Sequence, residues 1–263
     1  MNSFIKNFSE FLLKLNYKLP KRVENKILKA YKNEKGRAKF ALKIIIENFK
    51  LSKKFKTPLC QDTGIPVIFV ESKNSNFEKI KAKILKATKI AYKNLRKSTV
   101  LDPLKRKVSL TKPFIYLVGG KRNRITVFIK GGGCENVSGI FHFPPQINKK
   151  EFIEKLSDFI INNGINSCPP LFVGIGIGED TLGSVLLSYK ALLRNEKNRD
   201  PFYRKLEEEI KRRVNSLGSG IQGWGGKNMV LDVKIEKGPS HIASLTVSVM
   251  ISCHSFRYGE FRW

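Results

Sequence analysis

The sequence Pro58-Leu59-Cys60-Gln61-Asp62-Thr63-Gly64 lies between a long pattern typical of a helix and a short apolar run at residues 66–70. Those neighbours predict a loop that leads into a buried strand. Within five residues the loop carries a thiol, an amide, a carboxylate, a hydroxyl and a glycine. A functional site uses such a mixture, whereas a fold alone does not require it. The alternative interpretation is an irregular loop with an ordinary thiol.

Helical patterns dominate the first part of the chain. Residues 22–51 and 77–95 both carry apolar side chains at three- and four-residue spacing. The expected inward face of the first helix consists of Ala41, Ile44, Ile45 and Phe49. We expect the second helix to end near Arg96. A cation there suits the helix dipole, and a guanidinium can also clamp a carboxylate through two parallel hydrogen bonds.

Short strands follow. Residues 114–118 and 125–130, separated by Gly119-Gly120 and basic residues, predict a hairpin. Residues 229–236 and 245–251 alternate apolar and polar side chains, which predicts a sheet with one wetter face. Further helices are expected at 150–163, 182–193 and 195–214.

The fold class that these patterns predict is α+β. A helical N-terminal part, residues 1 to about 105, is followed by an α/β part with a mixed sheet, about 106–263, in one domain with one continuous core.

Two glycine runs are candidate binding loops. Gly131-Gly132-Gly133 ends a predicted strand and offers backbone amides to an anion, or else is a mobile connection. Gly174-Ile175-Gly176-Ile177-Gly178 has the wrong spacing for a dinucleotide fingerprint. Close packing of a strand on its neighbour explains those glycines better.

Three cysteines lie at junctions between predicted elements, where functional residues concentrate. They are Cys60, Cys168 and Cys253. Their separations are too long for a zinc finger or a local ferredoxin motif. Three thiolates from distant loops could hold an iron–sulfur cluster with one open iron, a Lewis acid for a hydroxy acid. Asp62, His241, Arg96 and the glycine amides are suitable proton carriers and carboxylate ligands. Inert buried thiols remain the alternative.

Composition sets broader limits. The chain has 263 residues, 41% of them hydrophobic, and a formal net charge of +28. Four cysteines are too few for a disulfide scaffold, and we see no signal peptide and no membrane span, so we expect a cytoplasmic protein. The charge allows nucleic-acid binding, but no nucleic-acid module is present. A lysine-rich solvated surface or an acidic partner explains the charge equally well.

Six blocks in order along nearly the whole chain, about 22–257, carry a resemblance. They are residues 58–64, 95–104, 130–136, 168–178, 225–227 and 241–254. Together they resemble the alpha subunit of class I, iron–sulfur fumarate hydratases and the similar alpha subunit of L(+)-tartrate dehydratase.

That resemblance implies a [4Fe–4S] cluster on Cys60, Cys168 and Cys253, and reversible hydration of fumarate, a dicarboxylate, to L-malate. The implied substrate-binding residues are Gln61, Arg96, Gly132 and Gly133. Asp62 and His241 would handle protons. In this family another domain or a beta subunit completes the site, so we expect an alpha subunit that is inactive alone and assembles as two alpha with two beta chains. Cys134 stands where the family usually has serine.

Overall fold

The computed structural model describes residues 2–72, 76–118, 120 and 122–263, which form two compact units that interleave along the chain. Unit 1 comprises the residues up to Pro20, Glu47–Gly132 and Ser255–Trp263, and unit 2 comprises Lys21–Ile46 and Gly133–His254. Each unit contains helices and strands, so the predicted α+β class is confirmed. The predicted domain limits stay a prediction.

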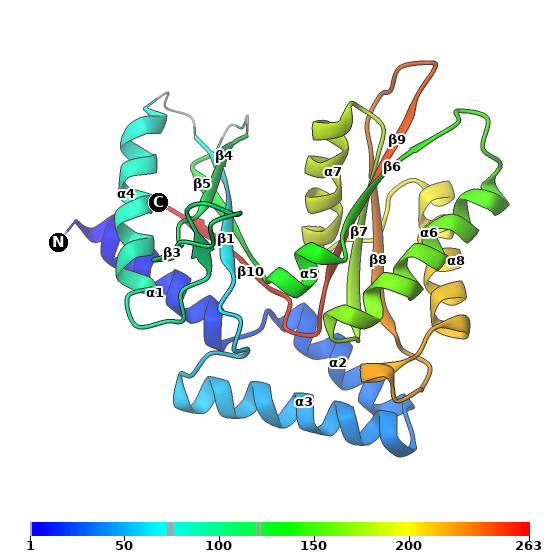
Figure 1. Cartoon of the computed structure of the whole chain (residues 1–263), viewed down its shortest axis with the longest axis horizontal. Helices are drawn as coiled ribbons and strands as arrows, with labels where there is room; N and C mark the ends of the chain where they lie inside the picture. The colour runs from blue at the N-terminus through cyan, green and yellow to red at the C-terminus, as the bar shows by residue number, and fades with distance from the viewer. Residues whose placement is uncertain (1, 73–75, 119, 121) are drawn as a thin grey trace. The chain divides into compact units, whose positions relative to one another are not determined.

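Unit 1 is built on a mixed four-stranded sheet in the order β10-β5-β1-β4 (Figure 1). Helices α1 and α4 pack together, and fully buried side chains such as Phe8 and Ile84 join them to Ile68 and Val127 of the sheet. The bounds are α1 (Ser3–Tyr17), β1 (Ile65–Glu71), α4 (Phe77–Ala91), β2 (Thr99–Val100), β3 (Val108–Ser109), β4 (Phe114–Leu117), β5 (Arg124–Lys130) and β10 (Arg257–Arg262).

The hairpin predicted from β4 and β5 is wrong. β1 lies between them and pairs parallel with β4 and antiparallel with β5. The reason is burial, because β1 has five consecutive buried residues and takes a central place, whereas β4 is largely exposed and forms an edge. Of the predicted turn at Gly119-Gly120, Gly119 lies outside the described residues.

The single helix predicted at residues 22–51 is also wrong. The structure has two helices, α2 (Lys21–Asn33) and α3 (Gly36–Phe55). Gly36 has a φ of +53°, which glycine adopts without the strain that a Cβ would bring. Ile44, which was expected to face inward, is 48% exposed.

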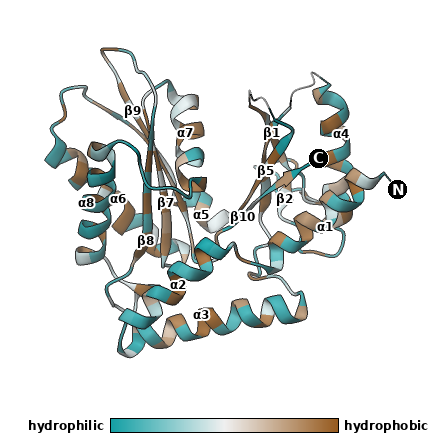
Figure 2. Ribbon diagram, turned by 180° about the vertical axis from the view of Figure 1, so that it is seen from behind, coloured by the Kyte–Doolittle hydropathy of each residue, from teal (hydrophilic) through white to brown (hydrophobic). Residues whose placement is uncertain are grey.

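Unit 2 has a second mixed sheet, in the order β6-β9-β7-β8. Helix α7 packs on this sheet, and α6 and α8 share the core cluster with alternate residues of β7 such as Val173 and Ile175 (Figure 1). Hydrophobic residues concentrate in β7, β8 and β9 (Figure 2). The bounds are α5 (Gly132–Asn136), β6 (Gly139–Phe143), α6 (Lys149–Gly164), β7 (Leu171–Ile177), α7 (Thr181–Leu193), α8 (Pro201–Leu217), β8 (Val230–Lys237) and β9 (Leu245–Ser252), with short 3₁₀ helices η1 (Ile165–Ser167) and η2 (Ile221–Gly223).

The glycines of β7 serve close packing, as predicted. A Cβ on Gly174 would overlap the carbonyl oxygen of Ser188, and a Cβ on Gly176 would overlap that of Ser184. Both serines belong to α7, so the helix backbone lies directly on the strand. These glycines therefore allow a helix to pack directly on the strand.

The wetter face predicted for the last two long strands is wrong for β8. Asp232 and Lys234 are buried, with exposed fractions of 7% and 8%, because both faces of the strand are covered. Arg22 donates to Asp232 at 2.7 Å and Lys26 pairs with it at 3.2 Å. Burial raises the pKa of Asp232, but Lys26 and Arg22 outweigh burial and lower it. Ion pairing thus lets polar residues occupy a buried strand.

No helix in the described ranges is both long enough and apolar enough to cross a bilayer.

Candidate active site

The Pro58–Gly64 loop is held at both backbone groups of Leu59. The Leu59 amide donates to the Asn16 carbonyl at 2.8 Å, and the Asn48 side chain donates to the Leu59 carbonyl at 2.9 Å. Leu59 itself is buried. Cys60 therefore follows a fixed point, and its half-buried sulfur accepts from the Asp62 amide at 3.4 Å.

Asp62 binds two backbone amides through its two carboxylate oxygens. Oδ1 accepts from Gly64 at 2.9 Å, and Oδ2 accepts from Gly132 at 2.7 Å. A Cβ on Gly131 would lie 3.0 Å from Oδ2, so glycine allows this close approach. One amide of the glycine run, that of Gly132, donates to the Asp62 carboxylate in this structure, and binding of a ligand anion by the run stays a prediction.

Arg96 lies beside the same loop. The Thr63 hydroxyl donates to the Arg96 carbonyl at 2.7 Å and lies 3.0 Å from the Ser98 hydroxyl. The helix before it, α4, ends at Ala91, so Arg96 is not in the last helical turn, where it was predicted. The Arg96 and Gln61 side chains are exposed. The structure thus brings the predicted Gln61, Asp62, Arg96 and Gly132 together with Cys60 in unit 1.

Arg257 is a buried contributor that the sequence analysis missed. Its guanidinium is 3% exposed and donates to the Asp62 carbonyl at 2.9 Å, the Asn16 side-chain oxygen at 3.2 Å and the Thr63 carbonyl at 3.5 Å. Its strand, β10, was not predicted, because Arg257–Arg262 lacks regular alternation. A buried arginine thus supports the backbone that presents Asp62.

Asn16 extends this network to Tyr92. Its amide donates to the Tyr92 hydroxyl at 3.2 Å. Burial raises the pKa of Tyr92 to about 12, against the opposing effects of the Asn16 hydrogen bond and the Arg257 charge. Tyr92 therefore stays protonated beneath the loop at neutral pH.

In unit 2, the turn that carries Cys168 is held by His254 and Gln222. Cys168 is exposed and has a left-handed backbone, φ +60°, before a cis Pro169–Pro170 peptide. The carbonyl of Cys168 lies 3.0 Å from His254 Nδ1, which donates if protonated there, and Gln222 donates from its backbone to the Pro169 carbonyl at 3.3 Å. Neither His254 nor Gln222 was predicted as a site residue, although His254 directly follows Cys253.

Strand topology brings Cys168 and Cys253 to one end of the sheet of unit 2. Antiparallel pairing sets Phe172 of β7 opposite Ser252 of β9. Cys253 directly follows β9, and Cys168 precedes β7 by three residues. Both thiols are at least partly accessible, whereas Cys134 in α5 is buried. None of the four cysteines forms a disulfide.

His241 lies at the other end of that sheet. It precedes β9, whose eight residues span about 25 Å. The side chain is exposed, and its Nδ1 accepts from the Ala243 amide at 3.1 Å. Unit 2 therefore does not bring His241 to Cys168 and Cys253. The predicted substrate-binding residue Gly133 is exposed, and it is the first residue of the second segment of unit 2.

Across the described residues, no group of three or more His, Cys, Asp or Glu side chains is arranged to hold a metal ion. The predicted ligands divide between the units, Cys60 in unit 1 and Cys168 with Cys253 in unit 2. The ligand assignment stays a prediction.

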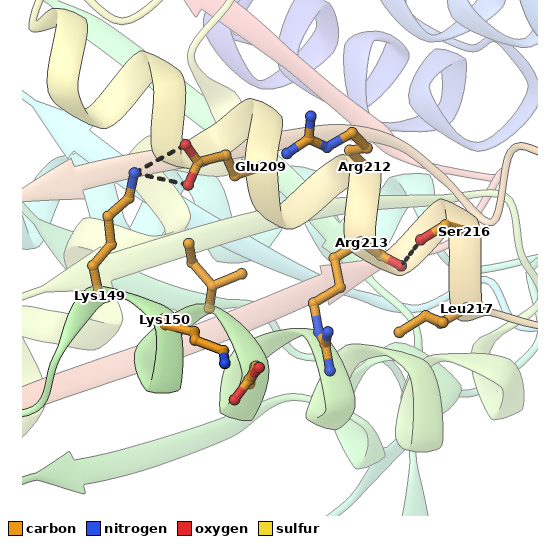
Figure 3. A pocket seen from close by; sticks show the side chains of 9 residues that line it. Lys149, Lys150, Glu209, Arg212, Arg213, Ser216 and Leu217 are labelled. Atoms are coloured by element: carbon orange, nitrogen blue, oxygen red, sulfur yellow. Dashed lines mark hydrogen bonds and ion pairs between the residues drawn. The ribbon is translucent and has the colours of Figure 1, made fainter.

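A hollow of about 700 Å³ lies between α6 and α8, and none of the predicted site residues lines it (Figure 3). Its charged walls pair internally, since Lys149 binds Glu209 at 2.8 Å. Lys149 also lowers the pKa of the Glu209 carboxyl through their hydrogen bond. The hollow therefore belongs to none of the predicted sites.

Comparison with known proteins gives a consistent result. A family model described as fumarate hydratase (Fumerase) matches residues 5–262. A putative L(+)-tartrate dehydratase subunit alpha from Methanocaldococcus jannaschii is 37% identical over 91% of this chain and 90% of its own. A putative fumarate hydratase class I from Geobacillus stearothermophilus is 30% identical over 98% of this chain but only 54% of its own length. The L(+)-tartrate dehydratase subunit alpha of Escherichia coli K12 is 25% identical over 98% and 90%.

Proposed function

The chain belongs to the fumarate hydratase (Fumerase) family of hydro-lyases, and on that premise we propose that it is the alpha-type subunit of a two-chain, iron–sulfur-dependent fumarate hydratase. The reaction adds water reversibly across the double bond of fumarate and gives L-malate. The observation that carries the proposal is the Cys60–Gly64 loop, where an accessible thiol and an amide-bound carboxylate are fixed side by side.

The three thiols fit an iron–sulfur cluster better than an inert core role. Cys60 and Cys253 are half-buried and Cys168 is exposed on a fixed turn, whereas Cys134 is buried and suits packing. These three residues would hold a [4Fe–4S] cluster. When bound, its open iron supplies Lewis acidity toward a hydroxyl and a carboxylate of the substrate.

Asp62 is proposed to carry a proton at its carboxylate. Two amides fix the orientation of both oxygens, and each oxygen keeps a second lone pair for a proton. Arg257 holds the carbonyl of the same residue from the buried side. The loop can therefore present this carboxylate in one fixed orientation.

Gln61, Arg96 and the Gly132-Gly133 segment are proposed to bind the substrate. The side chains of Gln61 and Arg96 are exposed beside the loop, and a guanidinium binds a carboxylate through two parallel hydrogen bonds. A dicarboxylate suits such a site because one end can meet Arg96 while the other is held elsewhere. The strongly positive chain also attracts anionic substrates.

His241 is proposed to act in the active site of a second copy of the chain. Within unit 2, His241 is a whole strand length from Cys168 and Cys253. A histidine on an exposed loop tip can reach the cysteine end of another subunit, and an assembly of two alpha and two beta chains provides one.

A two-chain enzyme is supported by the relatives. This chain covers nearly all of proteins named subunit alpha, but about half of the Geobacillus protein. The other half of the Geobacillus protein would correspond to the proposed beta subunit.

L(+)-tartrate dehydration is the second candidate, because the Methanocaldococcus and Escherichia relatives carry that name. The test is steady-state kinetics of the reconstituted pair with fumarate, L-malate and L(+)-tartrate. A higher kcat/KM for fumarate or malate supports the proposal, and turnover of tartrate alone replaces it with the second candidate.

A further inference from the structure

A glycine-rich loop presents a tryptophan on the surface of unit 2. Residues 218–226 contain five glycines around Trp224, whose side chain is 52% exposed. The indole stacks on Phe40 of α3, with ring centroids 6.5 Å apart and planes 1° from parallel, and Phe40 is itself 55% exposed. Two large aromatic side chains thus share one exposed surface.

The loop is fixed rather than loosely attached. Glu34, 3% exposed, accepts from the Lys227 amide and from the Asn228 side chain, both at 2.7 Å. Gly226 has a φ of +95°, and a Cβ there would lie 2.7 Å from the Ala38 Cβ. Glycine therefore lets the loop lie against α3 and hold Trp224 in place, a preorganised arrangement that lowers the entropic cost of binding.

The apolar surface continues along α3. Ile44 is 48% exposed. The spacing of four residues from Phe40 places these two side chains on one face of a helix with 3.6 residues per turn. The face that packs inward is a different one, formed by Leu42, Ile45 and Phe49 among others. A helix with a second, exposed apolar face leaves more apolar surface in contact with solvent than packing within its own chain requires.

Basic residues accompany this stripe. Lys43, Lys50 and Lys54 follow one flank of the helix, with Glu47 as the acidic residue among them. In an antiparallel pair of two such helices, the same flanks would face each other and bring the lysines of both copies together. That repulsion disfavours a second copy, and the net charge of +28 favours an acidic occupant.

We propose that the surface of unit 2 formed by Phe40, Ile44 and Trp224 binds the second chain of the enzyme, and that this chain presents an apolar surface with an acidic rim. The inference rests on the proposed function for the existence of that chain. The partner would be a chain corresponding to the part of the Geobacillus relative that this chain does not cover. We call these three residues the α3–Trp224 surface.

The position of the loop links this surface to the cysteine turn. Gln222, two residues before Trp224, donates through both its backbone and its side chain to the Pro169 carbonyl. A partner seated on Trp224 would therefore touch the segment that supports the turn of Cys168. Binding of the second chain and formation of that site are expected to be coupled.

The test uses the full chain and the chain from the same genome whose sequence matches the part of the Geobacillus relative that this chain does not cover. Affinity is measured by titration at low and high salt for the wild type, Phe40→Ser/Trp224→Ser, Ile44→Lys, and the control Leu182→Ser, whose side chain is 63% exposed on α7. Circular dichroism confirms that each variant is folded. The double variant and Ile44→Lys are expected to bind at least about thirtyfold more weakly, as for hot-spot residues, and the control to bind as the wild type does.

Equal affinity of all four proteins would overturn the inference, as would a partner chain of positive net charge or no binding by the wild type. Loss of self-association in the double variant, without loss of partner binding, would assign the surface to a second copy instead. Activity is measured separately. A tight wild-type pair that loses affinity in the variants yet hydrates no substrate would refute the proposed function and leave the docking surface intact.

Discussion

Replacing Asp62 by asparagine should destabilise the loop as well as stop the reaction. In the native loop, both carboxylate oxygens accept from backbone amides, Gly64 at 2.9 Å and Gly132 at 2.7 Å. Asparagine has one acceptor oxygen, so its NH₂ group must face one of these N–H donors. One charge-assisted hydrogen bond is lost and the remaining one becomes neutral.

The structure sets the size of this effect. Hydrogen bonds to a charged group contribute about 1.5–3 kcal/mol each, but the bond to Gly132 is exposed, which reduces its share. We therefore expect Asp62→Asn to lower the free energy of unfolding by about 1–2 kcal/mol, which corresponds to roughly 2–8 °C in the thermal midpoint. Turnover should fall by about 100-fold or more, as expected for loss of a proton carrier.

Gly132 provides matched controls for the stability effect. Gly132→Ala keeps the N–H donor, and its Cβ would lie 3.8 Å from the Asp62 carboxylate, an ordinary contact. Gly132→Pro removes the donor at the first residue of α5, a position where proline is tolerated.

Urea denaturation and thermal melts should show Gly132→Pro and Asp62→Asn destabilised and Gly132→Ala close to the wild type. The double variant Asp62→Asn/Gly132→Pro should lose less than the sum of its parts. Wild-type stability in both Asp62→Asn and Gly132→Pro would refute the reasoning, and near-normal turnover of Asp62→Asn would remove Asp62 from the proton-carrying role.

Three further predictions concern other parts of the molecule. Serine in place of any one of the three predicted cluster ligands should abolish iron binding while Cys134→Ser retains it, and full iron in a ligand variant would refute the assignment. Because the pKa of Tyr92 is raised from 10.0 to about 12 by burial, its stabilising contribution is complete below pH 10 and declines by about 2–3 kcal/mol as the pH rises to 12. Tyr92→Phe should therefore be less stable than the wild type near pH 8 but show a shallower decline in urea titrations above pH 10, and parallel declines would contradict this. Mixed assemblies of inactive Cys60→Ser and inactive His241→Asn chains should regain part of the activity if His241 acts in a second copy, and no recovery in verified mixed assemblies would refute that placement.

The loop at residues 58–64 was predictable because its sequence signals are local. A thiol, a carboxylate and a glycine within five residues indicated a site, and Gly64 does adopt a φ of +68° against Ile129 and Lys130. The glycines of β7 were predictable for the same reason, since spacing alone excluded the dinucleotide fingerprint. In both places the sequence signal and the physical requirement lie within a few residues.

Features that depend on distant pairing were not predictable. β4 and β5 adjoin in sequence, but the more apolar β1 takes the place between them. Arginine is usually a surface residue, so the sequence alone does not indicate that Arg257 is buried. Its burial follows from the pairing of β10 with β5 and from the hydrogen bonds that its guanidinium donates to the carbonyls of Asp62 and Thr63. Asp232 occupies a polar position in the alternating pattern of its strand, as a surface residue would. The ion pairs that allow its burial come from Arg22 and Lys26 of α2. Long-range partners decide each of these cases.

The separation of His241 from Cys168 and Cys253 is another consequence of topology. Sequence distance is short, 12 positions from His241 to Cys253, but β9 fills that interval as an extended strand. The same number of residues folded as a helix would span about half that distance.

Iron and acid-labile sulfide content of the anaerobically reconstituted chain, with its visible spectrum, tests the central claim most directly. The account predicts about four irons and four sulfides per chain and broad thiolate-to-iron absorption near ~400 nm, which Cys60→Ser abolishes and Cys134→Ser does not. A folded, colourless, iron-free protein that stays so after its second chain is added would contradict an iron–sulfur hydro-lyase.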